Sequence, residues 1–166
     1  MGRLASLVLL SMVVLAGCGF QLRGAGQIPA VLQRPYLEAA DRYTPFHAAL
    51  MESLTLAGVP AVPARDGATA VIRIHQDRVE REVLTISARN TPEEFELFYT
   101  VEFSVEVDGR EVLARQVLTL VRDYAYDETA VLAMQHEEDD IRAALARELA
   151  VLVTARLSAL PTSPAG

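Results

Sequence analysis

The sequence predicts an α+β fold in which two helices pack on one face of a mostly antiparallel four-stranded sheet, a two-layer sandwich. Three observations predict it. Residues 95–107 alternate strictly between apolar and polar side chains and are followed by the turn signal Asp108-Gly109. Two segments, 45–57 and the one that follows Asp127, carry apolar residues at helical spacing. The 166 residues, of which 51% are hydrophobic, suffice for one domain of ordinary size.

The composition excludes several classes of partner and site. Acidic residues outnumber basic ones by 22 to 15, and the net charge of −7 argues against a nucleic-acid partner, because neutralising phosphates needs surplus Lys and Arg. The single cysteine excludes an internal disulfide framework and a thiolate zinc site. We therefore expect no nucleic acid, no metal and no cofactor.

The first 17 residues are typical of a bacterial lipoprotein signal peptide. Arg3 precedes the apolar run 4–14, which is too short to cross a bilayer as a helix. The run closes with Leu15-Ala16-Gly17-Cys18, which resembles a lipobox. At such a sequence the chain is cut before the cysteine, the thiol receives diacylglycerol and the new amine receives an acyl chain. Residues 1–17 are then removed, and the lipid on Cys18 anchors the protein to a membrane.

Two other interpretations fit this end of the chain less well. The string at 15–18 fits a chance sequence at the end of a buried helix, but its distance from the N-terminus and the solitary cysteine oppose this. Residues 1–6 also fit the N-myristoylation pattern, although a continuous apolar stretch rarely follows such a site. Gly19 rather than Asp follows the cysteine, which in enteric lipoproteins indicates the outer membrane. We therefore expect an outer-membrane, lipid-anchored protein that faces the periplasm.

The first elements of the mature chain are short. Residues 18–34 contain Gly and Pro and are interpreted as an extended, lipidated tether. Residues 36–39 fit a short strand. A helix is expected over 45–57, with Thr44 at its N-cap, Pro at its first position and Gly just beyond its end.

Three antiparallel strands are expected next. Residues 70–87 alternate with one change of phase, which a bulge near 76–78 would explain. Residues 89–92 have the composition of a turn. The third strand, 95–107, has one buried and one wet face. A two-residue turn at Asp108-Gly109 predicts the cross-strand pairs Val107–Arg110, Val105–Val112, Phe103–Ala114, Tyr99–Leu118 and Glu102–Arg115.

The last helix is expected to have Asp127 as its N-cap and to run for roughly 28 to 30 residues. The acidic run 137–140 is interpreted as a solvated face of this helix. The folded domain is expected to span 35–158, and 159–166 to form a flexible tail. The apolar side of the helix is expected to consist of Val131, Met134, Ile141, Leu145, Leu149 and Leu152.

No arrangement of residues predicts a catalytic site. His47, His75 and His136 fall on three different elements, and the sequence holds no nucleophile elbow, phosphate loop or dinucleotide fingerprint. We therefore do not expect an enzyme. A lipid-anchored hydrolase that uses a carboxylate with one His is kept as the enzymatic alternative.

Two groups of residues are candidates for binding. Arg78, Arg81, Arg89 and Asn90 lie near the turn between the second and third strands, where guanidinium groups can grip an anionic headgroup in a bidentate manner. The alternative for this group is ordinary surface charge that protects a strand edge.

The second group lies at the end of the fourth strand and consists of Arg122, Tyr124 and Tyr126. Aromatic and Arg side chains at such a position fit an interface with a partner. They fit equally a corner that packs the final helix.

The mature N-terminus carries a family resemblance. The string Cys18-Gly19-Phe20-Gln21-Leu22-Arg23-Gly24 resembles the mature start of the LPS-assembly lipoprotein LptE family. The helix ending in Ala57-Gly58-Val59, the long middle hairpin, the 122–127 stretch and the acidic opening of the last helix resemble it too. The resemblance implies a two-helix, four-strand sandwich that plugs a large outer-membrane β-barrel of the LptD type, assists its folding and binds lipopolysaccharide.

The resemblance also implies site residues. An Arg that contacts lipopolysaccharide in family members falls on Arg89. A second basic position falls at about Met134, where this sequence departs from the family and a two-cation site is incomplete. The leading hypothesis is thus a non-catalytic plug and chaperone of the lipopolysaccharide-export barrel. The alternative is a lipoprotein binding module of another envelope lipid-transport system.

Overall fold

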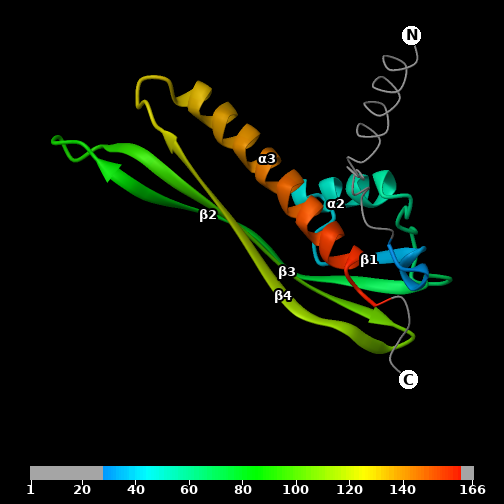
Figure 1. Cartoon of the computed structure of the whole chain (residues 1–166). Helices are drawn as coiled ribbons and strands as arrows, with labels where there is room; N and C mark the ends of the chain where they lie inside the picture. The colour runs from blue at the N-terminus through cyan, green and yellow to red at the C-terminus, as the bar shows by residue number, and fades with distance from the viewer. Residues whose placement is uncertain (1–27, 162–166) are drawn as a thin grey trace, which may run out of the picture.

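A computed structural model describes residues 28–161 of the chain. A four-stranded sheet has the strand order β1-β2-β3-β4, in which β1 is parallel to β2 and the other neighbours are antiparallel. Both α-helices lie on one face of this sheet (Figure 1), so the predicted α+β sandwich is confirmed. The elements are the 3-10 helix η1 (Ala30–Leu32), β1 (Pro35–Ala39), α2 (Pro45–Leu56), β2 (Ala70–Ile86), β3 (Pro92–Val107), β4 (Arg110–Ala125) and α3 (Val131–Ser158).

The molecule is elongated along β2, β3 and β4, and α3 crosses the sheet obliquely (Figure 1). We call the end that carries the β2–β3 turn and the β4–α3 loop the distal end. The proximal end carries β1, α2 and the β3–β4 turn. The main core lies where both helices cover the sheet. Its fully buried large side chains are Tyr99, Phe46, Phe103, Leu32, Leu50, Leu54, Ile72, Leu97, Leu145, Leu149, Leu157 and Val101.

Helix α2 begins as predicted. The Thr44 side chain accepts a hydrogen bond from the backbone N–H of His47, and Pro45 occupies the first turn. Gly58, just beyond the helix, has a φ of +80°, the left-handed conformation that ends many helices.

Helix α3 has 28 residues, the predicted length, but it begins at Val131 rather than directly after Asp127. The predicted N-cap is therefore wrong. The Asp127 carboxylate instead accepts hydrogen bonds from the backbone N–H and the hydroxyl of Thr129, at 2.8 and 2.7 Å. These contacts close a local turn before the helix, a common use of Asp.

The apolar side of α3 was predicted only in part. Leu145 and Leu149 are buried, whereas Val131 is exposed and Leu152 is 41% exposed. The sheet meets mainly the second half of the helix. Of residues 131–140, only Glu138 is buried. Helical spacing alone does not show where along its length a helix contacts a sheet.

The β3–β4 turn has the predicted geometry, since Asp108 and Gly109 both have positive φ, 50° and 77°, and Val107 pairs with Arg110. The register beyond the turn was predicted wrongly. Two single-residue shifts, near Val105, move later partners by two positions. The observed pairs are Val105–Leu113, Phe103–Gln116, Tyr99–Leu120 and Glu102–Val117.

Because the two shifts add up to an even number, β4 keeps the predicted faces. Leu120 still points to the helix side, opposite Tyr99. The predicted ion pair between Arg115 and Glu102 also forms, at 3.3 Å, although the two residues are not direct cross-strand partners. In β2 the first irregularity falls at His75, one residue before the predicted range, and two more follow between Val83 and Ile86.

The folded part of the chain begins earlier than expected. Residues 30–32, which belong to the segment interpreted as an extended tether, form a 3-10 helix, and Leu32 is only 1% exposed. Ile28 is also buried in the core. The predicted signal peptide and Cys18 lie outside the described residues, as do 162–166 of the predicted tail.

Candidate functional site at the distal end

A buried carboxylate joins α3 to the distal part of the sheet. Glu138 of α3 is 8% exposed. It accepts hydrogen bonds from the Tyr124 hydroxyl on β4 at 2.7 Å and from the Arg81 guanidinium on β2 at 2.8 Å. Arg142, one turn further along α3, donates a third. We call these four residues the Glu138 clamp.

Aromatic rings hold the clamp in place. The guanidinium carbon of Arg81 lies 4.5 Å from the centre of the Phe95 ring, a cation–π contact. The Phe95 ring stacks on Tyr124 at 5.9 Å and meets Tyr126 edge-on at 5.1 Å. The clamp therefore ties β2, β4 and α3 together, and Phe95 adds β3, at a level of the sheet that α2 does not reach (Figure 1).

The electrostatics keep the clamp charged. Burial by itself would raise the pKa of Glu138, but the hydrogen bonds from Tyr124 and Arg81 and the charge of Arg142 outweigh it and lower that pKa below its ordinary value. Burial and the bond to Glu138 raise the pKa of the Tyr124 hydroxyl. At neutral pH the site thus holds one carboxylate, two guanidiniums and a neutral phenol.

Sequence reasoning missed this site. Glu138 lies in the acidic run that was interpreted as a solvated face, and for this residue the interpretation is wrong. The spacing of Glu138 and Arg142, four residues apart on a helix, was the one local signal of a pair. The structure also brings together Arg81 and Tyr124, which the sequence had placed in two separate candidate groups.

The tip of the distal end is the β2–β3 turn. The Ser87 hydroxyl oxygen accepts hydrogen bonds from the backbone N–H groups of Arg89 and Thr91, at 3.1 and 3.2 Å. Asn90 has a φ of +62°, a conformation that Asn tolerates better than most residues. The turn thus exposes Arg89 and Asn90 on a hydrogen-bonded frame.

A shallow depression of about 230 Å³ adjoins this tip. Arg89 lines it from the turn, and Glu93, Tyr126, Asp127 and Glu128 line it from β3 and the β4–α3 loop. Within residues 28–161, Arg89 forms no ion pair. Its charge therefore faces solvent beside a depression that also carries the carboxylates of Glu93, Asp127 and Glu128.

The other candidate residues lie apart from the tip. Arg78 pairs with Glu80 at 3.0 Å on the sheet face away from the helices. Arg122 pairs with Glu148 of α3 at 2.9 Å. Met134, where the resemblance implied a second basic position, lies in the first turn of α3, and α3 begins near the distal end (Figure 1).

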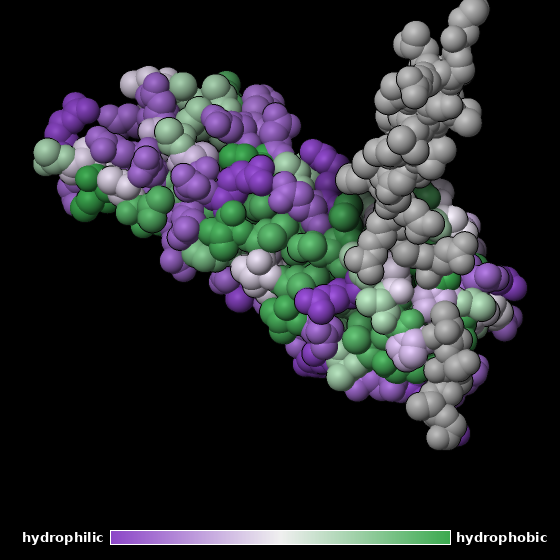
Figure 2. Space-filling view, viewed as in Figure 1, coloured by the Kyte–Doolittle hydropathy of each residue, from purple (hydrophilic) through white to green (hydrophobic). Residues whose placement is uncertain are grey.

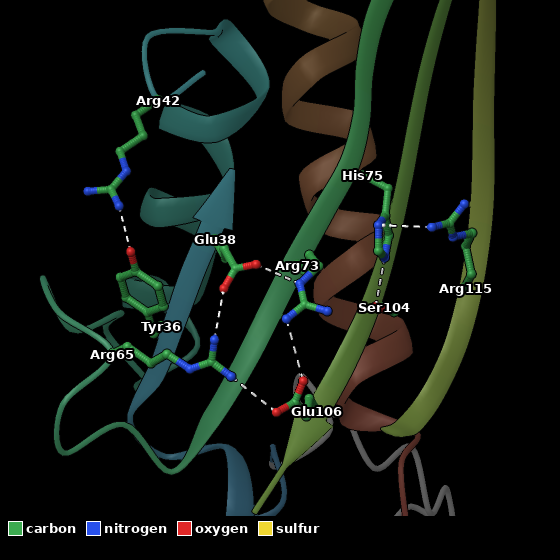
Figure 3. A network of polar contacts seen from close by, with 9 residues as sticks. All are labelled: Tyr36, Glu38, Arg42, Arg65, Arg73, His75, Ser104, Glu106 and Arg115. Atoms are coloured by element: carbon green, nitrogen blue, oxygen red, sulfur yellow. Dashed lines mark hydrogen bonds and ion pairs between the residues drawn. The ribbon is translucent and has the colours of Figure 1, made fainter. Parts of the chain in front are cut away.

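The sheet face away from the helices is polar at the proximal end (Figure 3). Arg65 bonds to Glu38 and Glu106, at 3.2 Å each, and Arg73 bonds to the same two carboxylates at 2.6 and 3.5 Å. These four side chains form a closed ring of alternating charge across β1, β2 and β3. His75 continues the polar surface toward β4.

Two further observations concern the described residues as a whole. Between residues 28 and 161, no group of three or more His, Cys, Asp or Glu side chains is arranged to hold a metal ion. In the same range, no helix is both long and apolar enough to cross a membrane.

Comparison with known proteins agrees with this architecture. The family model described as LptE, lipopolysaccharide-assembly, matches residues 32–157. The chain belongs to the LptE family. An LPS-assembly lipoprotein LptE from Pectobacterium atrosepticum is 31% identical over 160 residues, 93% of this chain and 85% of the relative. One from Yersinia enterocolitica is 30% identical and covers 80% of this chain and 64% of the relative.

Solved structures show the same fold. A minor lipoprotein from Acinetobacter baumannii has a TM-score of 0.66 at 25% identity and covers 82% of this chain and 100% of its own. A lipoprotein B from Nitrosomonas europaea has a TM-score of 0.69 at 22% identity, and the match covers 85% of this chain and 91% of the lipoprotein B chain. Membership of the LptE family gives this protein a role as a lipopolysaccharide-assembly lipoprotein. It also sets the hydrolase alternative aside, because the family is not one of enzymes.

Proposed function

We propose that this LptE-family protein is anchored to the outer membrane by lipid on Cys18. There it plugs and assists the assembly of a lipopolysaccharide-export β-barrel of the LptD type. In this proposal the distal end contacts lipopolysaccharide, with Arg89 and Asn90 as the first residues to meet it.

The observation that carries the lipopolysaccharide contact is the exposed Arg89 on its hydrogen-bonded turn. A guanidinium without an ion pair in the described chain is free to bind a phosphate group in a bidentate manner. The Glu138 clamp supports the proposal, since it fixes α3 to the strands of the distal end, which carries Arg89. In this assignment Arg81 stabilises the distal end and does not bind the ligand, because its guanidinium already pairs with Glu138.

The plug role is supported by the polar sheet face. A protein inside a wide barrel meets a largely polar, hydrated wall. The ring of Arg65, Arg73, Glu38 and Glu106 presents such a surface without net charge (Figure 3). The partner-interface candidates Arg122 and Tyr126 lie on the helix-covered side of the sheet. In this proposal they contact the barrel near the path that lipopolysaccharide takes.

The test is affinity purification of the tagged, full-length protein from detergent-solubilised outer membranes, with mass spectrometry of the eluate. We expect a large β-barrel protein in stoichiometric amount, lipopolysaccharide in the same fraction, and an acylated N-terminus that begins at Cys18. A Cys18→Ala variant, which cannot receive the lipid, serves as the control and should be absent from the outer-membrane fraction. Recovery of the lipidated protein with no large barrel partner would overturn the plug.

A further inference from the structure

An apolar groove runs along the seam between α3 and the edge strand β4, in the middle of the molecule. Leu120 of β4 and Val151 and Leu152 of α3 form its floor, and the groove has a volume of about 510 Å³. Val151 is 61% exposed and Leu152 is 41% exposed. Figure 2 shows hydrophobic surface gathered along this seam between more polar flanks.

The rim of the groove carries positive charge. Arg147 lines it and, within the described part of the chain, forms no ion pair. Glu148 also lines it and is neutralised by Arg122 at 2.9 Å. Of the two charged residues that line the groove, Glu148 is thus neutralised from outside by Arg122, and the positive charge of Arg147 remains, in a chain whose overall net charge is −7.

A second protein strand is a poor occupant of this seam. The neighbouring edge of β4 carries Arg115, Arg122 and Asp123. Charged side chains along an edge strand oppose pairing with another strand. An amphiphile with one apolar chain and an anionic head matches both the apolar floor and the basic rim. The volume also falls within the range of small-molecule sites, which are mostly apolar with a few placed polar groups.

We propose that the α3–β4 groove binds one acyl chain of an anionic lipid, with the headgroup phosphate beside Arg147. The inference rests on the proposed function only in naming lipopolysaccharide as that lipid. The groove lies away from the Arg89 tip, so the two contacts are separable by mutation.

The first experiment compares Leu152→Glu with Leu132→Glu in the full-length protein. Both substitutions place a carboxylate on α3 at an exposed apolar position, but Leu132, which is 74% exposed, lies outside the groove. Binding is measured with purified lipopolysaccharide and with the same lipopolysaccharide after complete deacylation, which removes both the ester-linked and the amide-linked chains. We expect Leu152→Glu to weaken binding of the intact lipid roughly tenfold and to leave binding of the deacylated molecule unchanged. Leu132→Glu should change neither.

The second experiment places a photo-crosslinking amino acid at Leu152 and, as a matched control, at Val121, an exposed apolar residue on the other face of β4. Irradiation of living cells should give a lipid adduct at Leu152 only. Equal lipopolysaccharide affinity of Leu152→Glu and the wild type, or adducts of Leu152 with protein alone, would overturn the groove assignment. If the wild type bound no lipopolysaccharide at all, the proposed function itself would fail instead.

Discussion

The Tyr124 hydroxyl donates a hydrogen bond of 2.7 Å to the carboxylate of Glu138, and so links the end of β4 to the exposed half of α3. Only Glu138 is buried among the first ten residues of that helix. The first turns of α3 are therefore held to the distal part of the sheet by a small charged cluster, which packs on the aromatic rings of Phe95, Tyr124 and Tyr126. The stability of the distal end should respond to single polar substitutions and to pH.

Replacing Glu138 with Gln should destabilise the protein by about 2 kcal/mol, because two guanidiniums and a phenol lose their charged acceptor. The partly exposed Arg81 and Arg142 recover some hydration, which limits the loss. Urea unfolding at pH 7 measures the effect. Glu137→Gln, at the exposed neighbouring position, should change the free energy of unfolding by less than about 0.5 kcal/mol. Equal midpoints for the two variants would contradict the clamp.

The lowered pKa of Glu138 predicts a loss of stability in acid. Its pKa in the folded state lies below the ordinary value of 4.5, so the unfolded state takes up the proton first as pH falls. The stabilisation by the charged Glu138 is complete above pH 4.5 and is lost as pH falls through the lower folded-state pKa. Unfolding free energies measured from pH 7 to pH 3 should therefore fall more steeply for the wild type than for Glu138→Gln. Parallel curves would show that another carboxylate dominates.

Leu32 should contribute to the core although it lies in the segment interpreted as a tether. Truncation to Ala at this fully buried position is expected to cost about 3 kcal/mol. Gln33→Ala, at the adjacent exposed position, should be nearly neutral. Chemical denaturation of the two variants gives the comparison. A neutral Leu32→Ala would mean that the folded domain begins only at β1.

His75 should report the contact with Arg115. The Arg115 guanidinium donates to Nδ1 at 3.1 Å, which leaves the proton on Nε2, 2.8 Å from the Ser104 hydroxyl (Figure 3). Burial first, and then the charge of Arg115, lower the pKa of His75 below 6.5.

Removing that charge with Arg115→Gln should raise the pKa of His75 part of the way back to 6.5. NMR titration of the ring protons measures it, with Arg110→Gln on the same strand as the control. Because the folded state resists protonation of His75, its contribution to stability should decline as pH falls below 6.5, and less so in the Arg115→Gln variant. An unchanged pKa in Arg115→Gln would refute the contact.

Arg89→Glu should weaken lipopolysaccharide binding roughly tenfold while leaving the complex with the barrel intact, since it reverses the charge at the exposed tip. Arg110→Glu is the matched control, because Arg110 follows the turn at the opposite end of β3. Binding of the purified variants to lipopolysaccharide and their co-purification with the barrel measure the two effects. Equal lipopolysaccharide affinities of Arg89→Glu and Arg110→Glu would show that Arg89 is an ordinary surface charge with no role in binding.

Local patterns were enough to predict the elements themselves. The alternation across 95–107 and the Thr44-Pro45 cap act between near neighbours in the chain, so they were visible in the sequence. The register of β4 was not, because single-residue bulges shift every later pair without disturbing the alternation of side chains. The start of α3 was misplaced because Asp127 closes a turn as readily as it caps a helix.

The candidate site was predicted less well than the fold. Arg89 and Asn90 were placed correctly at a turn, since Asn-Thr-Pro is strong local turn chemistry. The partner of Arg81 was invisible, because Glu138 lies 57 residues away in the chain. A buried carboxylate also has the same local signature as a solvated one, so the acidic run gave no hint of which member faces the sheet.

The amino-acid sequence by itself determined the order of strands and helices, the family resemblance and the expected anchor, because each depends on residues that are close along the chain. Only the tertiary structure decided which charges are paired, which apolar side chains of α3 stay exposed and where a groove opens beside β4. These outcomes depend on the angle at which α3 crosses the sheet, and that angle follows from the packing of all the elements together.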